Sequence, residues 1–340
     1  ERGVRPRMSD IRLYRDRDLL TIVNQWADAS SRFATATVIS TWGSAPREVG
    51  ALMIIHESRQ FFGSVSGGCV ENAVVEAALI SINEGQSRLI EFGVSDEDVL
   101  SIGLACGGQI QILIEPSTQL TSHWVTRALE TTRQRVSSTF VREMNSLGSK
   151  NPIENAYWLN RGDVDHGSAT RLDQKRSIFI QSFRPERRVI IIGGVHIAQA
   201  LVQGLAAIDL TVVIVDPREV WANPERFPDV EIRNQWPDDA LSALGVDPDT
   251  AVIALTHDPK FDDPALAIAL KSEAFYVGAL GGSKSAKSRR ERLLRLGLTD
   301  SEIDRLHSPI GLPIGAKGPS EITVSILADV IASYRNVVCD

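Results

Sequence analysis

The amino-acid sequence predicts an α/β protein of two domains, an N-terminal α+β domain followed by a doubly wound parallel-sheet domain. A length of 340 residues accommodates two domains. In the second half, four continuous apolar segments alternate with helical patterns, as is typical of parallel strands buried on both faces. The first half mixes helices and strands without that rhythm, which favours α+β. We place the first domain at residues 8–183 and the second at 184–340, because Arg184–Arg188 is charged and contains a helix-breaking proline.

The side-chain patterns predict the elements of the first domain in order. Asp16–Ser30 has apolar residues at spacings of three and four, which predicts an amphipathic helix, and a second helix is expected at Glu71–Asn83. A strand is expected at Phe33–Ser40, which alternates and is rich in Thr, Val and Ile, and further strands are expected at Ala51–Ile55, Gln60–Ser64, Arg88–Phe92 and Gln109–Ile114. The polar stretch Met144–Arg176 contains a short strand at Tyr157–Leu159 and is interpreted as a long hairpin.

The second domain is predicted from its apolar strands. These four strands are Val189–Ile192, Thr211–Val215, Thr250–Leu255 and Phe275–Gly278.

Composition excludes several classes of protein. The 36 basic and 43 acidic residues give a net charge of −7, which argues against a nucleic-acid-binding surface. No apolar run approaches the ~18 residues of a membrane span. The three cysteines, Cys69, Cys106 and Cys339, form no CxxC pair, so neither a disulfide framework nor a zinc knuckle is expected. The arginine-rich start has no apolar core of a secretory signal, so no signal peptide is expected there, and Met8 is the expected natural start. The cysteine usage and the lack of a signal favour a cytoplasmic protein.

Two turns in the second domain have the features of phosphate sites. Gly193-Gly194 joins a strand to a helix, and Asp216 ends the next strand, 23 residues on, where a dinucleotide fold places its ribose-binding acid. Val195 occupies the position of the second glycine of that fingerprint, so its side chain obstructs a pyrophosphate. Gly281-Gly282-Ser283 opens a basic helix whose cations are Lys284, Lys287, Arg289 and Arg290, which favours anion binding.

A histidine lies at the same expected sheet edge. His257 follows the third apolar strand, where open α/β sheets bind ligands, with Asp258 or Asp262 as the acid that orients it.

Two cysteines of the first domain lie beside paired glycines. Cys69 follows Gly67-Gly68 and precedes the helix at Glu71, and Cys106 precedes Gly107-Gly108. A helix N-terminus favours the reactive thiolate over the thiol, so we expect the Cys69 sulfur to lie near free backbone N–H groups. The alternative is that both cysteines are small buried hydrophobes.

These same segments resemble the signatures of the xanthine dehydrogenase accessory family, XdhC/CoxI. The first-domain segments are Thr41–Arg47, Gly63–Glu71 and Cys106–Gly108, and the second-domain segments are Thr256–Asp258, Gly278–Ser283 and Pro309–Lys317. The resemblance covers residues 20–116 and 189–331 and implies a Rossmann-like second domain. The chain departs from the family at Gly193-Gly194-Val195, where relatives usually have Gly-Ala-Gly.

The resemblance implies a chaperone that matures molybdenum hydroxylases, not an enzyme that turns over a small metabolite. Such proteins bind the molybdenum cofactor, protect it during sulfuration and insert it into the apo-enzyme. The implied partners are the apo-hydroxylase and a cysteine desulfurase, and a homodimer is the assembly considered. Cys69 and Cys106 are the expected contacts to molybdenum or sulfur. The expected cofactor-binding residues are Gly67, Gly68, Cys69, Cys106, Gly107, Gly193, Gly194, Asp216, His257, Gly281, Gly282, Ser283 and Lys284.

The alternative function is an NAD(P)-dependent oxidoreductase that uses the second domain directly. Val195 counts against it, as does the absence of a recognisable proton relay around a hydride site.

Overall fold

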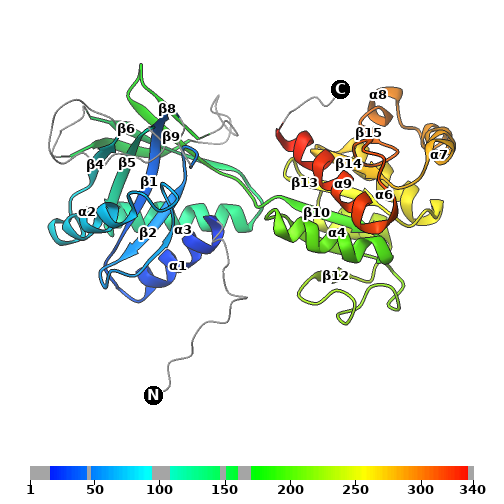
Figure 1. Cartoon of the computed structure of the whole chain (residues 1–340), viewed down its shortest axis with the longest axis horizontal. Helices are drawn as coiled ribbons and strands as arrows, with labels where there is room; N and C mark the ends of the chain where they lie inside the picture. The colour runs from blue at the N-terminus through cyan, green and yellow to red at the C-terminus, as the bar shows by residue number, and fades with distance from the viewer. Residues whose placement is uncertain (1–15, 44–46, 94–107, 146–150, 160–169, 336–340) are drawn as a thin grey trace. The chain divides into compact units, whose positions relative to one another are not determined.

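The computed structural model describes residues 16–43, 47–93, 108–145, 151–159 and 170–335. The chain divides into two compact units, residues 1–185 and 186–340, which Figure 1 draws in blue to green and in green to red. Within the described ranges, every helix is too short or too polar to cross a membrane.

The first unit contains a five-stranded antiparallel sheet with strand order β3-β2-β1-β5-β4. Its strands are β1 (Phe33–Trp42), β2 (Leu52–His56), β3 (Phe61–Gly63), β4 (Arg88–Phe92) and β5 (Gln109–Pro116). The helices of this unit are α1 (Asp16–Asp28), α2 (Glu71–Glu84) and α3 (Gln119–Arg133). The five strands and the helices α1 and α2 confirm the expectations from the side-chain pattern.

Alternate residues of β1 belong to different apolar clusters. Ala34, Ala36 and Val38 pack with α2, whereas Phe33 packs with α1 and α3. A second sheet covers part of the face opposite α2, where its residues surround Ile39 and Leu113. Both faces of the sheet are therefore buried.

That second sheet was not predicted. Its strands are β6 (Ser138–Met144), β7 (Ile153–Trp158), β8 (Arg171–Asp173) and β9 (Ile178–Phe183), in the order β7-β6-β9-β8. The interpretation of the region as a single long hairpin is wrong. In the sequence, Arg142 interrupts the apolar pattern that would mark β6 as a strand. In the structure Arg142 is fully buried, because its guanidinium pairs with Glu115 at 2.9 Å and donates to Gln181.

The second unit is a parallel six-stranded sheet with order β12-β11-β10-β13-β14-β15, which confirms the doubly wound prediction. Its strands are β10 (Arg188–Ile192), β11 (Thr211–Val215), β12 (Glu231–Arg233), β13 (Thr250–Ala254), β14 (Tyr276–Ala279) and β15 (Leu306–His307). Its helices are α4 (His196–Ala207), α5 (Pro237–Leu244), α6 (Pro259–Lys271), α7 (Ser283–Arg295), α8 (Asp300–Ile303) and α9 (Gly318–Arg335). The edge strands β12 and β15 are too short to show a sequence period.

Helices cover both faces of this sheet (Figure 1). Residues of α5, α6 and α7 pack on one face, and residues of α4 and α9 pack on the other. The strand order reverses at β10, which pairs with β11 on one side and with β13 on the other. Such a reversal leaves a crevice at the carboxyl ends of the strands, where ligands of open α/β sheets bind.

Candidate functional site

The glycine-containing loops that follow β1, β3 and β4 all begin at one end of the five-stranded sheet of the first unit, and we call them the glycine loops. Trp42 pairs with Gln109, and Phe92 pairs with Ile110, so β1 and β4 finish where β5 begins. Gly63 ends β3 at the same end, opposite Met53 near the start of β2. Antiparallel pairing thus gathers segments far apart in sequence. Cys106 and Gly107 lie outside the described residues, and Gly108, just before β5, is buried.

The loop that carries Cys69 is folded around the carboxylate of Glu71, which is buried. The carboxylate accepts hydrogen bonds from six groups of the loop: Ser64 Oγ (2.6 Å), Val65 N (3.3 Å), Ser66 N (2.9 Å), Ser66 Oγ (2.6 Å), Gly68 N (2.9 Å) and Val70 N (3.2 Å). Burial alone would raise the pKa of the Glu71 carboxyl, but hydrogen bonds from Ser64 and Ser66 lower it to about 2. Glu71 is therefore ionised at neutral pH and determines the shape of the loop.

The remaining N–H groups of the loop also have internal partners. Cys69 N donates to Ser66 Oγ at 3.0 Å, and Gly67 N donates to Ser64 Oγ at 2.9 Å. The N–H groups of residues 65–70 therefore have internal partners, and an internal carboxylate takes the place expected for an outside anion. The expectation that the Cys69 sulfur lies near free N–H groups at the start of α2 stays a prediction. The Cys69 thiol itself is free and exposed, so it is not a buried hydrophobe.

Glu71 is the important residue that we did not single out from the sequence. The available signal was an acidic residue in the first turn of a helix, three residues after a turn that contains two serines and two glycines. An acid at this place interacts favourably with the helix dipole and with unpaired N–H groups.

A cavity of about 460 Å³ lies beside this loop. Its lining residues are Phe61, Gly63, Ser64, Gly67, Gly68, Glu71 and Asn72. Gly68 has a φ of +119°, and no atom lies within 4 Å of the position that a Cβ would take. The backbone at Gly67-Gly68 is thus open to a ligand, and Cys69 is the next residue along the chain.

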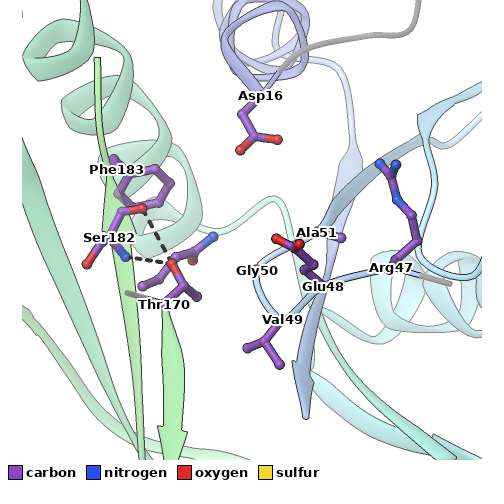
Figure 2. A pocket seen from close by; sticks show the side chains of 10 residues that line it. Asp16, Arg47, Glu48, Val49, Gly50, Ala51, Thr170, Ser182 and Phe183 are labelled. Atoms are coloured by element: carbon purple, nitrogen blue, oxygen red, sulfur yellow. Dashed lines mark hydrogen bonds between the residues drawn. The ribbon is translucent and has the colours of Figure 1, made fainter. Parts of the chain in front are cut away.

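A second cavity of about 410 Å³ lies between residues 47–51 and the segments around Thr170 and Ser182 (Figure 2). Figure 2 shows the side chains of Asp16 and Glu48 at this cavity. Arg47, on its wall, donates from Nε to the carbonyl oxygen of Ser64 at 3.2 Å. This contact ties the loop after β1 to the loop that carries Cys69.

In the second unit, the Gly193-Gly194 turn is packed against the unit's own chain. Gly193 has a φ of +104°, and a Cβ on Gly194 would lie 2.4 Å from the carbonyl oxygen of Trp221. Gly194 N donates to Asp216 Oδ2 at 3.0 Å, and Arg218 forms two side-chain hydrogen bonds of 2.8 Å to the same carboxylate. Burial tends to raise the pKa of Asp216, but Arg218 and Gly194 lower it.

Both carboxylate oxygens of Asp216 therefore accept hydrogen bonds from groups of the same unit. An acid that binds ribose hydroxyls needs a free oxygen, and this one is occupied by Arg218 and by the glycine turn. These contacts of Asp216 argue against a dinucleotide bound in the usual pose of this fold, and so does the Val195 side chain at the position of the second glycine.

His257 lies in the predicted position, just beyond the carboxyl end of β13. It is exposed and has a φ of +61°, a strained conformation for a histidine that is often found at functional sites. The two proposed orienting acids have other roles. Asp258 caps α6 by accepting from Lys260 N, and Asp262 accepts from Thr256 Oγ1 at 2.6 Å.

The turn before α7 keeps only part of its expected positive charge. Gly281 has a φ of +136°, and Gly282 caps the helix, with Ser283 and Lys284 exposed in its first turn. Arg289 is buried under the turn and donates to Leu280 O at 2.8 Å. Arg290 forms ion pairs with two acids near α8, Asp300 and Asp304. Lys284 and Lys287 are left exposed to solvent, so they are the side chains that remain for an anion.

Across the described ranges, no group of three or more histidine, cysteine or acidic side chains is placed to hold a metal ion.

Comparisons with known proteins agree with the architecture. The family model of the XdhC Rossmann domain matches residues 189–330, and the model of the XdhC and CoxI family matches residues 26–93. The molybdenum cofactor insertion chaperone PaoD of Escherichia coli (strain K12) is 30% identical over 300 residues, which cover 88% of this chain and 82% of PaoD. A probable xanthine dehydrogenase component of Bacillus subtilis (strain 168) is 27% identical over 93% of this chain and 98% of its own length.

A solved structure is also similar. A crystal structure described as a xanthine dehydrogenase from Bacillus halodurans matches with a TM-score of 0.74 and 26% identity, over 93% of this chain and 96% of that one. The two family models cover the resembling segments except Cys106–Gly108, and they follow each other in the same order. The chain therefore belongs to the XdhC and CoxI family, with an N-terminal XdhC/CoxI region and a C-terminal XdhC Rossmann domain.

Proposed function

We propose that this chain is a maturation factor for molybdenum hydroxylases of the xanthine dehydrogenase type. It binds the molybdenum cofactor, protects it during sulfuration and inserts it into the apo-enzyme. The observation that carries the proposal is the exposed Cys69 thiol on a loop held in place by Glu71, beside a cavity of about 460 Å³. Family membership and the similarity to a molybdenum cofactor insertion chaperone support it.

The cofactor is the cargo of this protein, and its chemistry fits the residues of the loop. A thiolate is a soft ligand, suited to a metal–sulfur centre, and one exposed cysteine provides a contact that can be released. A transient contact is what a chaperone needs, because it must hand its cargo on. Cys106 is proposed as a second contact, and it lies outside the described residues.

Two protein partners belong to the proposal: the apo-hydroxylase, which receives the cofactor, and a cysteine desulfurase, which supplies the sulfur. A homodimer is the assembly that we propose to test by light scattering of the purified chain.

The function is tested by reconstitution. Apo-hydroxylase is incubated with molybdenum cofactor, a cysteine desulfurase and its cysteine substrate, with and without this chain. We expect hydroxylase activity to appear faster and to a higher level when the chain is present. Equal activation with and without the chain would contradict the function.

The ligand that remains after purification separates this function from an NAD(P)-dependent oxidoreductase. A chaperone should release a fluorescent oxidised pterin on denaturation, whereas the oxidoreductase should release a nicotinamide dinucleotide. The occupied Asp216 carboxylate and the Val195 side chain favour the pterin.

We further propose that the turn before α7 binds an anionic group such as a phosphate. Replacing Lys284 and Lys287 together with glutamine should weaken the binding of inorganic pyrophosphate by about tenfold at low salt, and by less at about 0.5 M salt because ions screen the attraction. Isothermal titration measures the affinity. The control is Lys271→Gln/Arg295→Gln, which removes the same charge from exposed sites of the same unit. Equal affinities for the two double variants would show that the turn holds no anion.

A further inference from the structure

The lining of the cavity beside Cys69 includes an exposed aromatic ring and an amide side chain that the proposed function does not yet use. Phe61 belongs to the edge strand β3, and its residue is 42% exposed although it lines the cavity. None of the described aromatic rings packs against it. Asn72, in the first turn of α2, is also exposed and lines the cavity. An aromatic face left in solvent loses the stabilisation that ring contacts provide.

The other walls suit a flat molecule. Gly67 and Gly68 present backbone without side chains, and nothing lies within 4 Å of the position of a Cβ on Gly68. Glu71 forms part of the lining, but the loop already donates to both of its oxygens. Asn72 is therefore the lining side chain whose amide group is available for donating and accepting hydrogen bonds to a ligand.

Two contacts join the strand and the helix that carry the lining residues. Arg59, in the turn before β3, is ion-paired with Glu76, one helical turn beyond Asn72. Ser64, the residue after β3, donates to Glu71 at the start of α2. The Ser64–Glu71 contact joins the end of the β3 segment to the start of α2, the two elements that carry Phe61 and Asn72, and the exposed Arg59–Glu76 pair adds a weaker link between them. Part of the lining is thus in place before any ligand binds, which lowers the entropic cost of binding.

We propose that Phe61 and Asn72 form a binding slot for the pterin ring of the cofactor. The ring stacks on Phe61, and its amide-like edge exchanges hydrogen bonds with Asn72. A cavity of about 460 Å³ is of the size that small-molecule sites have. Cys69 follows the lining residue Gly68 directly in the chain, so the slot adjoins the segment that carries the proposed thiol contact. This inference rests on the proposed function and names the part of the cargo that the slot recognises.

The experiment measures the affinity of the full chain for free 6-carboxypterin by fluorescence quenching. We expect Phe61→Leu to weaken binding about tenfold, because it keeps an apolar side chain but removes the ring face. Phe61→Tyr keeps the ring and should bind nearly as the parent does. Asn72→Ala should weaken binding about fivefold through lost hydrogen bonds. Ile80→Ala, an exposed apolar residue two turns further along α2, is the matched control and should leave affinity unchanged.

Several outcomes would overturn the slot. These are no binding of 6-carboxypterin by the parent chain, equal affinity of Phe61→Leu and Ile80→Ala, or guanosine binding as tightly as the pterin. Circular dichroism of each variant checks that it is folded. The reconstitution assay separates the two proposals. If the parent chain activates the hydroxylase but Phe61→Leu binds pterin normally, the slot is wrong and the function stands. If pterin binding depends on Phe61 but no activation occurs, the slot stands and the function is wrong.

Discussion

Replacing Cys69 with serine should reduce activation of the apo-hydroxylase to the level seen without the chain. Serine is close to cysteine in size, and the Cys69 side chain is exposed, so folding should survive. A serine hydroxyl is not ionised at neutral pH and is a hard oxygen ligand, whereas a thiolate ligates soft metals and accepts transferred sulfur. The variant therefore keeps the shape of the loop and loses the chemistry of the sulfur.

The measurement is the reconstitution assay with Cys69→Ser, and Cys339→Ser serves as the matched control. The control has the same chemical change outside all three glycine loops and should activate as the parent does. Cys106→Ser is run beside them, because both cysteines are predicted contacts. Full activation by Cys69→Ser would show that this thiol takes no part in cofactor delivery.

Replacing Glu71 with glutamine should destabilise the Cys69 loop and the unit that contains it. The glutamine keeps one acceptor oxygen but brings an NH₂ group against N–H donors such as those of Gly68 and Val70. Losing hydrogen bonds to a buried charge should lower the free energy of unfolding by about 2–3 kcal/mol. Urea denaturation measures this loss, and hydrogen exchange of the amides of residues 64–70 should become faster at the same time.

Glu76→Gln is the control for Glu71→Gln. Glu76 lies on the same helix but forms an exposed ion pair with Arg59, so its loss should cost less than about 1 kcal/mol. Equal destabilisation by the two variants, with unchanged exchange in the loop, would contradict the role of Glu71 as the residue that shapes it.

The stabilisation by Glu71 should depend on pH in a defined window. The folded-state pKa of about 2 lies below the usual value of 4.5, so the unfolded chain binds a proton more readily than the folded chain. The stability advantage of the parent over Glu71→Gln should therefore be complete above pH 4.5. It should shrink as the pH falls from 4.5 towards 2, where the folded carboxyl also takes up a proton.

The strands of the second unit could be predicted because each is a run of apolar residues between helical patterns. Such a run has one stable environment, the middle of a sheet covered on both sides, and the structure places Val189 and Ile190 in the apolar clusters of opposite faces. The strand β6 could not be predicted in this way. Its Arg142 is polar in sequence, and it is buried only because Glu115 and Gln181, distant in the chain, satisfy its guanidinium.

For the glycine loops, too, some features could be predicted from the sequence and others depend on the folded structure. The sequence showed paired glycines beside Cys69, and in the structure Gly67 and Gly68 line a cavity. The partners of the loop N–H groups could not be known, because a glycine-rich turn can surround an outside anion or an internal carboxylate. In the structure the internal carboxylate of Glu71 accepts from the loop N–H groups, and the carboxylate of Asp216 accepts from Gly194 N at the Gly193-Gly194 turn.

By itself, the sequence determined the two fold classes, the order of the motifs and the family, since all three depend on local periodicity and on residue identity. The tertiary structure alone decided which charges remain exposed. Arg289 is buried and Arg290 forms ion pairs within the second unit, whereas Lys284 and Lys287 are exposed to solvent. The tertiary structure also brought Phe61 and Asn72 to one cavity. The reason is physical: hydrogen bonding and ion pairing depend on distances between residues that are remote in the chain, and those distances exist only after the sheets have formed.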